Sequence, residues 1–123
     1  MMTGSEYQQA ALRTCKIPYD RDPLAEVFPD CWERGAIIHA VSEINSEAGE
    51  IAGIIQKIYQ GHNFDRDHMK KEIGDVLWGI AELCCALGFS VDDVMETNIE
   101  KLRARYPDGF DSDRSLHRQK GDV

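Results

Sequence analysis

The chain has 123 residues, of which 42% are hydrophobic and 29% charged, a balance typical of one globular domain with a core of modest size. Its 14 basic and 22 acidic residues give a formal net charge of −8, which disfavours a nucleic-acid polymer as partner because phosphate backbones are repelled. A nucleotide is not excluded, since a metal ion can bridge its phosphates to carboxylates.

The sequence has no apolar run near the roughly 18 residues of a membrane span and no apolar core of a signal peptide. We therefore expect a cytoplasmic protein that makes no membrane contact and keeps its thiols reduced. The four cysteines lack zinc-type spacing. Adjacent Cys84 and Cys85 stand in an apolar helical run, where we expect both to be small core residues.

Residues 1–33 predict a short helix followed by a connecting loop. The helix is expected over residues 5–15, with Ser5 as its N-cap. Its expected inward side chains are Tyr7, Ala11 and Leu12. Prolines exclude a helix interior over residues 16–30, so this stretch predicts a loop with a turn near Ala25.

The core region, residues 34–106, has apolar residues at intervals of three and four, which predicts long amphipathic helices. These helices are expected over residues 31–60, 68–87 and 91–106. The inward face expected of the first consists of Ile37, Ile38, Val41, Ile44, Ala48, Ile51, Ile55 and Ile58. The sequence therefore predicts an all-α fold over one domain, residues 1–123.

Local signals mark the ends of these helices. Asp65 or Asp67 is the expected N-cap of the second, Gly88 its stop, and Ser90 the N-cap of the third. The polar residues 107–123 predict a loose tail, with Phe110 as a candidate anchor.

One acidic pattern occurs twice, as Glu47-Ala48-Gly49-Glu50 and as Glu72-Ile73-Gly74-Asp75. Acids three residues apart share one face of a helix. Glycine costs roughly 1 kcal/mol against alanine inside a helix, so the matched glycines predict a close approach of two helices. Antiparallel packing would gather four carboxylates, whose mutual repulsion predicts a bound cation. Oxygen ligands alone favour Mg²⁺, with Mn²⁺ as the alternative.

Further polar residues extend this candidate site. Glu43 and His39 share the polar stripe of the first acid pair, a stripe that is also typical of a solvated face. We take Glu43 as a further candidate metal ligand and His39 as a candidate substrate contact. Asn98 and Lys101 share a face of the last helix and offer a donor and a cation for a phosphate. Arg105 extends that set.

Four segments resemble the MazG-like nucleoside triphosphate pyrophosphohydrolases: residues 38–40, 46–51, 71–78 and 98–110. The family signature is Glu-x-x-Glu, a spacer and Glu-x-x-Asp, and here residues 51–71 form the spacer. The resemblance covers about residues 34–110. Many members carry a further acid directly before the first glutamate, where this chain has Ser46.

The resemblance implies an all-α bundle completed by a homodimer or a dimer of dimers. It implies Mg²⁺ bound by the four acids Glu47, Glu50, Glu72 and Asp75. Asn98 and Lys101 would hold the triphosphate, and Trp78 or Trp32 would either stack on the base or pack in a core or interface. The implied reaction is hydrolysis of a nucleoside triphosphate to a monophosphate and pyrophosphate, with one of the acids as general base, for housekeeping of the nucleotide pool.

Two other interpretations account for less of the sequence. A di-iron carboxylate bundle uses Glu-x-x-His, and neither acid motif has a histidine three residues after its glutamate. A non-catalytic helical dimerisation module would leave the matched glycines and the convergent acids without a cause.

Overall fold

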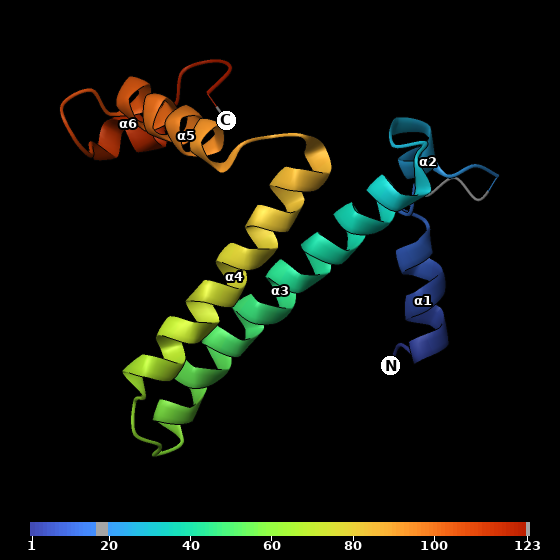
Figure 1. Ribbon diagram of the computed structural model, residues 1–123. Coiled ribbons are helices and arrows are strands. Elements are labelled where there is room, and N and C mark those ends of the chain that lie inside the picture. Colours follow the sequence, from blue (N-terminus) through green and yellow to red (C-terminus); the bar gives the residue numbers. More distant parts are fainter. Residues whose placement is uncertain (17–19, 123) are drawn as a thin grey trace. The chain divides into compact units, whose positions relative to one another are not determined.

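The computed structural model describes residues 1–16 and 20–122, which form six α-helices and no β-strand (Figure 1). The predicted all-α fold class is confirmed. The chain divides into two compact units, Met1–Arg34 and Gly35–Val123. Of the prolines that predicted a loop, Pro18 lies outside the described residues.

The first unit contains α1 (Gly4–Leu12), whose N-cap is Thr3 and not the predicted Ser5. The Thr3 hydroxyl accepts a hydrogen bond from the Glu6 amide at 3.2 Å, and the Glu6 carboxylate accepts one from the Thr3 amide at 2.6 Å. This capping box places a negative charge at the positive end of the helix dipole, whereas a box from Ser5 would place the neutral Gln8 there. The predicted inward packing of α1 is wrong: none of its residues is buried.

The predicted loop contains a second short helix, α2 (Pro23–Val27). Pro23 occupies the first helical position, where a missing N–H costs nothing because that amide has no partner inside the helix. Asp22 caps α2 by accepting hydrogen bonds from the amides of Leu24 at 3.1 Å and Ala25 at 3.3 Å. The sequence prediction missed α2 because it took every proline of this stretch to exclude a helix.

The second unit is built on α3 (Cys31–Tyr59) and α4 (Arg66–Leu87), which lie side by side and antiparallel (Figure 1). Both match the predicted ranges within about two residues. Asp30 caps α3 through the amides of Trp32 and Glu33 at 2.9 and 2.8 Å. Asp65 caps α4, and Gly88 ends it at a φ of 74°, a left-handed conformation that favours glycine.

The seam between α3 and α4 follows the helical period. On α3 the less exposed positions include Ile37, Ala40, Ile44, Glu47, Ile51 and Ile54. On α4 they include Met69, Glu72, Val76, Gly79, Leu83 and Cys84. Glu47 and Glu72 therefore occupy positions that this period otherwise fills with core residues.

Part of the predicted inward face of α3 lies outside this seam. Ile38, Val41, Ile55 and Ile58 remain 40–50% exposed. The sequence has apolar residues on two faces of α3, and within the chain α4 covers one of them.

The adjacent cysteines Cys84 and Cys85 differ in exposure. Cys84 is buried and Cys85 is exposed, so the expectation that both are core residues is wrong for Cys85.

The close approach of α3 and α4 occurs at Gly79. A Cβ added there would lie 2.9 Å from Ile44 Cγ1 and 3.3 Å from the Ile44 amide nitrogen. The prediction that Gly49 and Gly74 mark the close approach of the two helices is wrong, because a Cβ at either position would meet nothing within 4 Å. Those two residues lie off the seam, on faces that neither α3 nor α4 covers.

The chain continues into α5 (Val91–Arg105), capped by Ser90 as predicted, and α6 (Ser112–Leu116). None of α5 is buried, and its axis is bent by 102° from that of α4. Within the described part of the chain, no single helix has the length and apolar content of a membrane span.

The predicted loose tail is wrong in part. It forms α6, and Asp122 accepts a hydrogen bond from Arg105 Nε at 2.7 Å. The candidate anchor Phe110 has its ring 5.3 Å from that of Tyr106, although its side chain stays exposed.

Candidate metal centre

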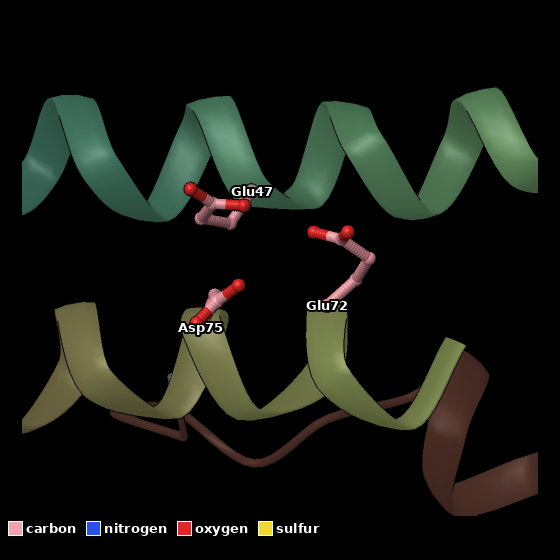
Figure 2. A group of neighbouring side chains, drawn as sticks. All are labelled: Glu47, Glu72 and Asp75. Atoms are coloured by element: carbon pink, nitrogen blue, oxygen red, sulfur yellow. The ribbon is translucent and has the colours of Figure 1, made fainter. Parts of the chain in front are cut away.

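Three carboxylates converge between α3 and α4. Glu47 reaches from α3 and Glu72 and Asp75 from α4, with their side chains directed toward one another (Figure 2). One oxygen of each lies within 4.8 Å of the others. The antiparallel packing predicted from the sequence thus gathers three of the four acids.

The seam explains why these side chains meet. Glu47 and Glu72 occupy seam positions and are half-buried, while Asp75, one turn after Glu72, remains exposed at the edge. The Glu72 side chain is only 14% exposed, and its Oε1 lies 2.7 Å from His68 Nε2. The site is therefore anchored on helix backbones and open to solvent on the side of Asp75.

Burial and like charge act together on Glu47. Its pKa is raised, first by loss of solvation and then by the neighbouring carboxylates of Glu72, Asp75 and Glu43. Charges of one sign this close repel unless a proton or a cation lies among them. The arrangement favours a cation, because all the candidate ligand atoms are carboxylate oxygens.

The spacing leaves room for a small hard cation. Mg²⁺ binds oxygens octahedrally at about 2.1 Å, so neighbouring ligand oxygens lie about 3 Å apart and only opposite ones about 4.2 Å apart. The three carboxylate oxygens lie within 4.8 Å of one another and would draw together by up to about 2 Å to bind one ion. Rotation of the three side chains would supply that movement.

The two remaining acid candidates, Glu50 and Glu43, do not belong to the group of three carboxylates. Glu50 is exposed and does not belong to the group of three, because three residues after Glu47 the helix has turned past the seam. The prediction that four motif acids converge is therefore wrong for Glu50 in the structure of the single chain. Glu43 is half-buried and close enough to contribute to the raised pKa of Glu47.

His39 and Trp78 lie together near the far end of the seam. His39 Nδ1 is 2.8 Å from Glu82 Oε1, and its ring meets that of Trp78 edge-on with centroids 6.3 Å apart. Trp78 is 55% exposed. The sequence interpretation had not paired Glu82 with His39, nor His68 with Glu72, although the spacing of four residues in the second pair would have indicated it.

The candidate phosphate contacts lie elsewhere. Asn98 and Lys101 are exposed on α5. About 18 Å of helix separates Asp75 from the end of α4, after which α5 departs at 102°. Arg105, also assigned to substrate from the sequence, is held by Asp122. The chain does not gather these residues around its own acids.

The chain is similar to known proteins. Residues 38–110 match the model of the MazG nucleotide pyrophosphohydrolase domain. The "Gene 37 protein" of Mycobacterium phage L5 is 30% identical over 98 residues, which cover 76% of this chain and 81% of the phage protein. No solved structure was found to match the chain. The matched domain contains all three convergent carboxylates.

Proposed function

Because the chain belongs to the MazG nucleotide pyrophosphohydrolase family, we propose that it hydrolyses nucleoside triphosphates to a nucleoside monophosphate and pyrophosphate, with Mg²⁺ as its metal. The resemblance inferred from the sequence is thereby confirmed at the level of the family. The observation that carries the proposal is the convergence of Glu47, Glu72 and Asp75.

The chemistry follows from what the acids and a hard cation do. Bound Mg²⁺ would offset the charge that develops on the leaving pyrophosphate and orient a water for in-line attack. Glu47, Glu72 and Asp75 would hold the cation, and a carboxylate oxygen not used as a ligand would accept the proton of the attacking water. His68, at 2.7 Å from Glu72, keeps that side chain turned into the seam. The water's oxygen joins the α-phosphorus, and the pyrophosphate leaves with the bridging oxygen.

A second copy of the chain would complete the site. Lys101 and Asn98 are exposed on α5 and would hold the triphosphate opposite the metal from the partner chain. The chain carries the apolar surface that such a partner needs. Among its exposed apolar side chains are Ile38, Val41, Ile55, Ile73, Leu77, Met95 and Ile99. Exposed apolar residues on successive helices are typical of a surface that binds a partner, and they support the proposal of a dimer.

The base would lie near Trp78. This ring is 55% exposed and makes an edge-to-face contact with His39, so part of it is accessible for stacking on a base. Glu43 and Glu50, which lie on either side of Glu47 in α3, would be further candidate ligands of the metal.

Substitution of the acids tests the site. Glu47→Gln and Asp75→Asn keep size and remove one charged ligand each, so we expect either to lower Mg²⁺-dependent pyrophosphate release by at least about 100-fold. Glu96→Gln removes an exposed acid from α5 and serves as the matched control, with activity unchanged. Full activity in Glu47→Gln or Asp75→Asn would exclude this site. Absence of hydrolysis in the unaltered chain would favour the alternative, a non-catalytic dimerisation module.

Mixing two impaired variants tests the shared site. Glu72→Gln and Lys101→Ala damage opposite halves, and a random mixture of dimers would restore about a quarter of the sites. No recovery after subunit exchange would mean that both residues serve one chain. Sedimentation that shows only a 13.9 kDa species at micromolar concentration would also contradict a dimer.

A further inference from the structure

A cavity of about 540 Å³ lies between α5 and the C-terminal segment, residues 111–122. Lys101, Ala104 and Arg105 line it from α5, and the rest of the lining comes from the C-terminal segment. Its volume falls within the roughly 300–1,000 Å³ of small-molecule sites. The cavity is separate from the three carboxylates, none of which lines it.

The lining is cationic in an otherwise acidic chain. Lys101, Arg105, Arg114 and Lys120 face two acids, Asp113 and Asp122, which gives a formal charge of +2 (four minus two) where the chain as a whole carries −8. Each acid already has a partner. Asp122 is bound to Arg105, and Asp113 Oδ1 lies 3.0 Å from His117 Nδ1.

The remaining cations have no directly bonded partner within the described residues, although Lys101 lies close enough to Asp122 for the two charges to interact. Lys101, Arg114 and Lys120 have neither a hydrogen bond nor an ion pair of their side chains there. Three such cations on one cavity repel one another, and an anion relieves that repulsion. A chain of several linked phosphates meets more of them at once than a single phosphate does.

The pair of Arg105 and Asp122 gives the cavity a fixed wall. Arg105 Nε donates to Asp122 Oδ2 at 2.7 Å, and a second hydrogen bond runs from Nη2 to Oδ1. The two side chains are only 11% and 16% exposed. The hydrogen bond to Arg105 lowers the pKa of Asp122, and the same bond raises the pKa of Arg105, so both groups stay charged. These two hydrogen bonds hold Asp122 of the C-terminal segment against α5.

We propose that this cavity binds the phosphate chain of the nucleotide, with Arg114 and Lys120 of the C-terminal segment acting beside Lys101. The inference rests on the proposed function for the identity of the nucleotide, although not for the binding of a phosphate chain. Lys101 connects the cavity with the proposed function, because it is the candidate triphosphate contact and also lines the cavity. The family match ends at residue 110, so Arg114 and Lys120 lie beyond it and no motif of the matched domain would reveal them.

Binding of tripolyphosphate without divalent cations tests the proposal separately from catalysis. We expect calorimetry to detect binding to the unaltered chain, and we expect the ligand to raise its melting temperature. The double variant Arg114→Gln, Lys120→Gln should bind about tenfold more weakly, a loss at the lower end for charged contacts because these side chains are exposed. The double variant Lys57→Gln, Arg103→Gln is the matched control, since it also removes one lysine and one arginine and neither residue lines the cavity.

The outcomes separate the two hypotheses. Loss of binding in Arg114→Gln, Lys120→Gln together with unchanged binding in Lys57→Gln, Arg103→Gln supports the cavity, whether or not the chain hydrolyses nucleotides. Equal losses in these two double variants would indicate general electrostatic attraction and overturn the proposal. So would absence of binding to the unaltered chain, or orthophosphate binding as tightly as tripolyphosphate. A nucleoside triphosphate that competes with tripolyphosphate for the unaltered chain assigns the phosphate chain to the nucleotide; failure to compete overturns that assignment.

Discussion

Gly79→Ala should destabilise the chain although alanine is the better helix former. The added Cβ would lie 2.9 Å from Ile44 Cγ1 and 3.3 Å from the Ile44 amide nitrogen. Ile44 is β-branched, so its χ1 has little freedom to move aside. The backbone atom cannot yield without moving α3, so the two helices must separate slightly.

The magnitude follows from two opposing terms. Replacing glycine by alanine inside a helix stabilises by about 1 kcal/mol, and overpacking a tight contact costs about 1–3 kcal/mol. The expected net loss in the free energy of unfolding is about 1 kcal/mol, which lowers the melting temperature by roughly 4–8 °C in a unit of this size.

Thermal unfolding followed by circular dichroism measures this loss. Gly74→Ala is the matched control on the same helix, where a Cβ meets nothing within 4 Å, and there we expect a rise in melting temperature of a few degrees, since about 0.5–1 kcal/mol is gained. Gly79→Ala should also weaken Mg²⁺ binding, because the separation of α3 and α4 sets the distance between the carboxylates. A rise in melting temperature equal to that of Gly74→Ala would refute the close approach at Gly79.

Two further predictions concern charge. The pKa of Glu47 is raised, so the stability that its protonated form contributes is present below its ordinary pKa and is lost as pH rises through the raised value. Glu47→Gln should therefore raise the melting temperature of the metal-free chain at about pH 7 and change it little at about pH 4; the same gain at both pH values would argue against charge repulsion in the seam. Lys101→Ala should lower kcat/KM for a nucleoside triphosphate roughly tenfold to a hundredfold, from about 1.5–3 kcal/mol for a charged contact to phosphate. Arg103→Ala, whose side chain does not line the cavity, should change kcat/KM little, and the reverse order of the two variants would place the phosphate on another face of α5.

The long helices were predictable because their signals are local. Asp65, Ser90 and Gly88 mark ends of α4 and α5 through interactions that span only a few residues. The period of apolar residues then gives the extent of each helix. Thr3 was missed because both Thr3 and Ser5 begin a capping pattern, and the preference between them depends on the charge of Glu6.

The site was only partly predictable, because the helical period does not say which apolar face meets which partner. α3 has two such faces, and the choice of one puts Glu47 into the seam and leaves Glu50 exposed. The glycine of closest approach depends on the same choice, which selects Gly79. The C-terminal cavity carried no local signal at all, because it depends on a contact between Arg105 and Asp122, which are far apart in the sequence.

The products of nucleotide hydrolysis test the central claim most directly. Phosphorus NMR of a nucleoside triphosphate incubated with the unaltered chain should show nucleoside monophosphate and pyrophosphate in equal amounts when Mg²⁺ is present, and neither when it is removed. Glu47→Gln under the same conditions should leave the triphosphate intact. Release of a diphosphate and orthophosphate, or turnover that persists without a divalent cation, would contradict the proposed reaction at the three carboxylates.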